Sequence, residues 1–154
     1  MSQEIKLSSE ELKLISLFQK ITRASARDVI EDEKLNRLIF VVNEGKMGLA
    51  IGKGGANIKN LQNIIKKPVE LVEYAPEPEA FLKNMLNPKF VQDVKFSERL
   101  DGTTQAEVTV DAAKKGVVVG REGRHAQKAR LLAKRYFNIT KVLINSPEPL
   151  AMEW

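Results

Sequence analysis

The sequence predicts a mixed α/β (α+β) fold of two similar units in tandem, each a three-stranded sheet packed against three helices. Two observations support this prediction: a glycine pattern returns at a fixed distance along the chain, and the hydrophobic periodicities around it return in the same order. A chain of 154 residues is long enough for two small domains. We expect them over residues 1–75 and 76–145, with a tail over 146–154.

Three glycines of the first half recur 68 residues later in the second half. The chain contains only nine glycines, so a shared offset for three of them argues for an internal repeat. The corresponding pairs are Gly48 and Gly116, Gly52 and Gly120, and Gly55 and Gly123.

The elements of the first unit follow from capping, periodicity and proline. Ser8 and Glu11 form a capping-box pattern, and apolar residues then recur at helical spacing. Pro68 must end a later helix, because proline has no N–H to donate. The predicted elements are a helix over 8–22, hairpin strands around 29–30 and 38–42 joined by a charged turn over 31–34, a short helix before the glycines, a helix after them that ends at Pro68, and a strand over 69–74.

The second unit repeats that order. Asp101 and Gly102 form a turn signal, and Ala106, Val108 and Val110 alternate with polar residues as a half-buried strand does. The predicted elements are a helix over 79–86, strands near 91–98 and 104–110, a short helix before the second glycine cluster, a helix after Gly123, and a strand over 139–144. Four aromatic side chains at core spacing are predicted to pack inside the units, and they are Phe18, Phe40, Phe81 and Phe137.

Positive charge gathers around both glycine clusters. The net charge is +5 and the isoelectric point about 9.4. Residues 46–67 hold five basic residues and no acidic one, and residues 114–141 hold nine basic residues against the single acid Glu122. Charge runs are often no more than solvated faces. Beside a glycine turn, however, such an excess favours a polyanionic ligand.

A glycine turn at the start of a helix is suited to a phosphodiester. Glycine adopts φ values that other residues avoid and has no Cβ to hold a ligand away. The N–H groups and the positive dipole end of the following helix then face the anion. Lys53 and Arg121 add charge at the two turns, and Ile51, Ile58 and Leu71 could form an apolar groove for bases beside the first.

The segment Ile51-Gly52-Lys53-Gly54-Gly55-Ala56-Asn57-Ile58 resembles the KH-domain pattern Ile-Gly-x-x-Gly-x-x-Ile at every defined position. The second segment is similar but ends in Ala126. The predicted element order resembles the type II KH arrangement, and two such domains over residues 5–145 resemble the archaeal NusA family of transcription factors. KH loops clamp about four nucleotides of single strand. The RNA-binding residues that the residue chemistry and the resemblance together indicate are Ile51, Gly52, Lys53, Gly54, Gly55, Ile58, Lys59, Gly120, Arg121, Glu122, Gly123, Arg124 and Lys128.

The resemblance implies single-stranded RNA as the partner, during elongation, termination or antitermination of transcription. RNA polymerase is a candidate partner, although we expect no room here for the polymerase-binding and oligonucleotide-barrel domains of bacterial relatives. A KH-type ribosome-associated or ribosome-assembly protein is the alternative function, and single-stranded DNA is an alternative ligand. Because Glu122 should repel phosphate, we expect the first loop to dominate binding.

Other function classes find little support. Without cysteine, disulfides, thiolate zinc sites and cysteine nucleophiles are excluded. His125 is the only histidine, so it has no partners for a metal cluster or a triad, and we expect it to face solvent. The glycine spacing fits neither the P-loop nor the dinucleotide fingerprint. We therefore expect no enzyme activity, no metal, no cofactor and no small-molecule substrate.

The sequence also predicts a cytoplasmic protein without a membrane partner. Its longest aliphatic or aromatic run, residues 38–42, is far shorter than the roughly 20 residues that span a bilayer. The first residues are polar, unlike a signal peptide. Trp154 either folds back on a domain or docks on a partner, and the sequence does not choose between these.

Overall fold

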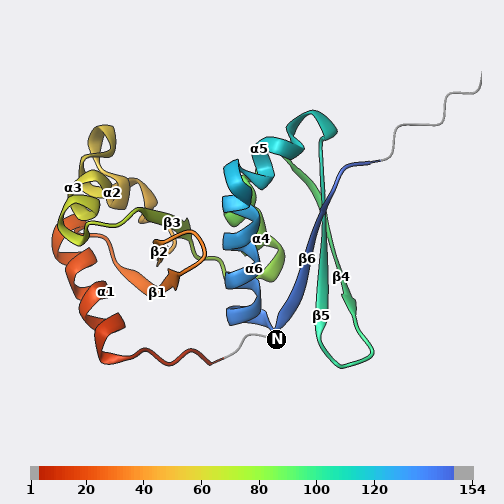
Figure 1. Cartoon of the computed structure of the whole chain (residues 1–154), viewed down its shortest axis with the longest axis horizontal. Helices are drawn as coiled ribbons and strands as arrows, with labels where there is room; N and C mark the ends of the chain where they lie inside the picture. The colour runs from red at the N-terminus through yellow and green to blue at the C-terminus, as the bar shows by residue number, and fades with distance from the viewer. Residues whose placement is uncertain (1–3, 148–154) are drawn as a thin grey trace, which may run out of the picture. The chain divides into compact units, whose positions relative to one another are not determined.

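The computed structural model describes residues 4–147, and the order of its helices and strands repeats in the two halves of the chain (Figure 1). The contacts of these residues group into two compact units, residues 5–84 and, together with Glu4, residues 85–147, called here the first and second unit. Helix α4 (Pro78–Leu86) lies across this division. The bounds 1–75 and 76–145 therefore stay a prediction, and most of the tail, including Trp154, lies outside the described residues.

Helix α1 (Ser9–Thr22) begins at the predicted capping box. The Glu11 N–H donates to Ser8 Oγ at 3.1 Å, and the Ser8 N–H donates to Glu11 Oε1 at 2.8 Å. Such a reciprocal cap stabilises a helix by about 1 kcal/mol. The helix ends at Arg23, whose left-handed φ of 65° turns the chain toward the first strand.

The first sheet has the order β1-β2-β3, with β1 (Ala26–Asp32) antiparallel and β3 (Val69–Glu73) parallel to the central β2 (Arg37–Val42). Parallel neighbours need a crossover connection. Here the crossover consists of the helices α2 (Met47–Ile51) and α3 (Ala56–Ile65). The glycine turn between these helices is thus anchored to the sheet at both ends.

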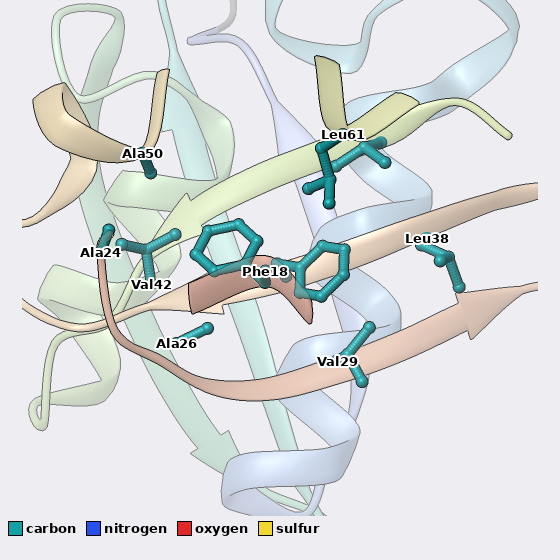
Figure 2. Packing of buried hydrophobic residues seen from close by; sticks show 10 residues of the cluster. Phe18, Ala24, Ala26, Val29, Leu38, Val42, Ala50 and Leu61 are labelled. Carbon is teal, nitrogen blue, oxygen red and sulfur yellow. The ribbon is translucent and has the colours of Figure 1, made fainter. Parts of the chain in front are cut away.

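The core of the first unit lies between this sheet and its helices. Phe18 of α1 stacks on Phe40 of β2, with ring centroids 4.7 Å apart, and both rings are fully buried. Figure 2 shows Phe18 among other buried side chains, including Leu61 of α3 and Ala50 of α2. Burial of each large apolar side chain contributes about 1.5–3 kcal/mol. The same cluster therefore fixes both helices that flank the glycine turn.

A buried ion pair occupies the end of the first hairpin. Arg37 Nε donates to Asp32 Oδ2 at 2.9 Å, and their side chains are only 4% and 1% exposed. Arg37 Nη1 also lies 3.8 Å from Glu70 Oε1. The interpretation of residues 31–34 as a turn is thus wrong at its start, because β1 continues to Asp32 and buries it.

The second unit has the same topology. The order of its sheet is β4-β5-β6, in which β5 (Thr104–Val110) pairs antiparallel with β4 (Val91–Glu98) and parallel with β6 (Ile139–Asn145). Ala106, Val108 and Val110 are fully buried, as their alternation predicts. Helices α5 (Lys115–Val119) and α6 (Arg124–Phe137) form the crossover. Short turns of 3-10 helix complete the two units, and they are η1 (Lys53–Gly55), η2 (Ala112–Lys114) and η3 (Arg121–Gly123).

The predicted elements are all present with ends shifted by a few residues. The first strand, predicted around 29–30, is longer, and α3 ends at Ile65, before Pro68, because Lys66 adopts a left-handed φ of 62°. The four phenylalanines predicted for the core are buried. Within residues 4–147, none of the helices is both long and apolar enough to cross a membrane.

Candidate nucleic-acid interface

The first glycine loop, residues 52–55, has a defined left-handed backbone. Gly52, Gly54 and Gly55 have φ values of 77°, 63° and 77°, which residues other than glycine rarely adopt. The Gly52 N–H donates to the Gly48 carbonyl at 3.0 Å, and the Gly55 N–H donates to the Gly52 carbonyl at 3.1 Å. These bonds close the end of α2 and the turn itself, so the start of α3 is held in place.

The second glycine loop, residues 120–123, repeats this backbone. Gly120, Glu122 and Gly123 have φ values of 85°, 59° and 71°. The Gly120 N–H donates to the Gly116 carbonyl at 3.0 Å, and the Gly123 N–H donates to the Gly120 carbonyl at 3.0 Å. The sequence repeat is therefore a repeat of backbone conformation and hydrogen bonding.

The two loops differ in chemistry at their third residue. Gly54 and Glu122 occupy the same left-handed position, at φ 63°, ψ 20° and φ 59°, ψ 21°. Glutamate has no local reason to prefer this conformation, which costs a non-glycine residue roughly 1 kcal/mol. Both residues are exposed, so the second loop presents a carboxylate to solvent where the first presents bare backbone.

The glycines of each loop are needed for different reasons. A Cβ on Gly52 would lie 2.8 Å from Asn57 Cγ, and one on Gly120 would lie 2.6 Å from His125 Cδ2. A Cβ on Gly54 or Gly123 would meet nothing within 4 Å. The first glycine of each loop thus makes room for the chain's own next helix, whereas the space beside Gly54, the third residue of its loop, and beside Gly123, the fourth residue of its loop, is open.

The structure leaves most of the predicted RNA-binding residues accessible. Four of the five predicted basic residues are exposed, namely Lys53, Lys59, Arg121 and Arg124. Lys128 differs, because it is only 5% exposed on the buried face of α6. Its assignment as a phosphate contact is therefore not supported by accessibility. His125 is half-buried against Gly120, so the expectation that it faces solvent is only partly met.

The apolar residues predicted for a base-binding groove divide into two kinds. Ile51 is 39% exposed, whereas Ile58 and Leu71 are partly buried against the core cluster. Two apolar residues that the sequence pattern did not single out, Leu49 and Val117, are 48% and 57% exposed. They occupy equivalent positions in α2 and α5, so the repeat itself was the signal that could have found them.

No other site chemistry emerges from the described part of the chain. Residues 4–147 contain no group of three or more histidine or acidic side chains arranged to hold a metal ion. The exposed basic residues beside the two glycine loops place positive charge next to the following helix N-termini, an arrangement that suits an anionic ligand.

Comparison with known proteins agrees with this geometry. A family described as KH domain matches residues 14–99, which include the first glycine loop. A protein of Halobacterium salinarum, "Probable transcription termination protein NusA", is 39% identical over 90% of this chain and 96% of its own length. The chain belongs to the archaeal NusA family of KH-domain proteins.

A second protein of that name and a solved structure are similar over most of this chain. The protein of the same name from Methanocaldococcus jannaschii is 32% identical over 92% of this chain and 75% of its own length. The crystal structure of APE1850 matches with a TM-score of 0.82 and 39% identity, and the match covers 90% of this chain and 99% of that one.

Proposed function

We propose that this chain is a single-stranded RNA-binding transcription factor that acts in elongation, termination or antitermination through two tandem KH domains. The observation that carries the proposal is the pair of glycine loops with one backbone conformation and exposed basic side chains beside each. Family membership supports it, since the similar proteins are named as probable transcription termination proteins.

Each loop suits a sugar-phosphate backbone rather than a base edge. The N-terminal N–H groups of α3 and α6 follow the loops directly, and no side chain caps either helix at Gly55 or Gly123. These groups and the helix dipole favour an anion at that position. Lys53 and Arg121 add a positive charge to the first and second loop, respectively. Two such loops would track one extended strand.

The first loop is proposed to dominate binding. Gly54 leaves its backbone open, whereas Glu122 brings a carboxylate to the corresponding point of the second loop. A carboxylate near a phosphodiester opposes the charge attraction that drives such binding. The second loop would then contribute less to the binding free energy than the first.

Fluorescence anisotropy with labelled single-stranded RNA across a salt series tests the clamp. The variant Lys53→Asp/Gly54→Asp should weaken binding about a hundredfold and lower the salt slope by roughly 0.7 for each phosphate that the loop no longer neutralises. Arg121→Asp should have a smaller effect. Lys13→Asp/Ser16→Asp is the matched control, because it makes the same charge change at exposed residues of α1.

Three outcomes would contradict the proposal. These are a wild-type protein that binds no single strand, a folded loop variant that binds as tightly as the control, and equal binding to duplex RNA. Matched single-stranded DNA distinguishes the two sugars. Copurification with RNA polymerase and a change in transcript termination would support the transcription role, whereas copurification with ribosomal particles would favour the alternative of a ribosome-associated protein.

A further inference from the structure

Asn57 joins the ends of two helices to the start of a third. It is the second residue of α3, and its Nδ2 donates to the Leu49 carbonyl of α2 at 2.8 Å. The same Nδ2 lies 3.5 Å from the carbonyl of Thr22, the last residue of α1. The last carbonyls of a helix have no partner within it, so each contact satisfies a group that would otherwise need water.

The first glycine loop rests directly on this side chain. A Cβ on Gly52 would lie 2.8 Å from Asn57 Cγ and 2.9 Å from the Asn57 backbone nitrogen. The absence of a side chain at Gly52 therefore allows the amide to reach α2 beneath the loop. Asn57 and Gly52 form one packed unit that determines where the loop begins.

The second glycine loop has a planar side chain in the same place. His125 follows Gly120 as Asn57 follows Gly52, and a Cβ on Gly120 would lie 2.6 Å from His125 Cδ2 and 3.1 Å from His125 Cγ. Like Asn57, His125 is half-buried. Both loops thus lie over a flat polar group at the second position of the following helix.

We propose that Asn57 is the positioning residue of the first glycine loop, with His125 as its counterpart in the second. The inference rests on the proposed RNA-binding function, since the ligand for which the loop is positioned is a single-stranded RNA phosphate. Asn57 acts through Gly52 and the end of α2, not by touching RNA. When a loop is already fixed before binding, the ligand does not have to supply the free energy that orders it.

Substitution of Asn57 tests the inference with two readouts. Asn57→Leu keeps the size of the side chain and removes its donors, Asn57→His introduces the residue of the second loop, and Asn63→Leu is a matched control at an exposed position of α3. The readouts are the heteronuclear NOE of the Gly52, Gly54 and Gly55 amides without RNA, and the Kd for labelled single-stranded RNA.

Loss of the donor should loosen the loop before it affects the fold. In Asn57→Leu the three glycine NOE values should fall and RNA affinity should drop about tenfold, the effect of a hydrogen bond at the upper end of its usual range. Asn63→Leu should change neither readout, and Asn57→His should return affinity to within about threefold of wild type. A higher affinity for Asn57→His than for Asn57→Leu would not be expected if the Asn57 amide merely filled space.

The inference is overturned if Asn57→Leu matches Asn63→Leu in both readouts. Should Asn57→Leu not fold, Asn57→His decides alone: retained glycine NOE values with affinity within about threefold support the inference, and a larger loss overturns it. If wild type binds no single strand, the proposed function fails, while the NOE comparison still decides whether Asn57 orders the loop.

Discussion

The two glycine loops follow one backbone path with different side chains on it. Gly54 in the first corresponds to Glu122 in the second, and Asn57 beneath the first corresponds to His125 beneath the second. The comparison separates what the loop conformation requires from what a ligand would require. A small residue at the start and a planar polar one beneath are common to both loops, whereas the charge at the third position is not.

The two hairpins also share a backbone arrangement and carry different side chains on it. Asp32 faces Arg37 near the turn of the first hairpin, and Ser97 faces Gln105 at the corresponding rung of the second, 68 residues after Arg37. The first pair is a buried ion pair, while Ser97 is exposed. Equivalent backbone positions thus carry a costly buried charge in one unit and an ordinary surface residue in the other.

The largest expected effect comes from breaking that ion pair. Arg37→Leu leaves the Asp32 carboxylate buried without its partner, so we expect the free energy of unfolding to fall by about 3–5 kcal/mol. Urea denaturation followed by circular dichroism measures it. Gln105→Leu, the equivalent change in the second unit, should cost less than about 1 kcal/mol. An equal loss of unfolding free energy in the two variants would show that the ion pair makes no special contribution to the stability of the first unit.

A methyl group at two glycines should separate packing from backbone strain. Gly52→Ala meets Asn57 and a positive φ together, and we expect it to cost about 2–3 kcal/mol. Gly54→Ala meets only the positive φ in open space, and should cost about 1 kcal/mol. Thermal unfolding of both variants provides the test. A Gly54→Ala loss as large as that of Gly52→Ala would mean that contact with Asn57 contributes nothing.

The smallest expected effect exchanges charge between the loops. Glu122→Gln should raise affinity for single-stranded RNA about two- to threefold at low salt, because it removes a negative charge beside the strand. The reciprocal Gly54→Glu should lower affinity by a similar factor or more. Anisotropy at two salt concentrations checks both, since a charge effect shrinks as salt rises. An unchanged Kd for Glu122→Gln would place that carboxylate away from the ligand.

Local patterns predicted the elements and the glycine loops well. The capping box at Ser8, the alternation over 104–110 and the repeated glycines each depend on residues close together in the sequence, so their structural meaning survives without knowledge of the fold. Even the correspondence between Gly54 and Glu122 is visible from the repeat alone.

Features that depend on distant neighbours were not predictable in this way. Lys128 was expected among the RNA-binding residues, but burial of its face of α6 depends on packing that helical spacing alone did not reveal. A charged residue such as Asp32 is typical of a turn, and only the buried contact with Arg37 explains its place in a strand. The contacts of Asn57 come from α1 and α2, elements that no local pattern connects to it.

The place of each glycine loop inside a crossover has a consequence for folding kinetics. β2 and β3 pair in parallel, as do β5 and β6, and each pairing must wait until the segment that contains the loop has closed. Contacts between residues so far apart in sequence slow folding, because chain entropy is lost before the pairing energy is gained. The rate at which each sheet forms should therefore depend on how readily its glycine turn adopts the left-handed conformation, which makes refolding rate a measure of loop order that needs no RNA.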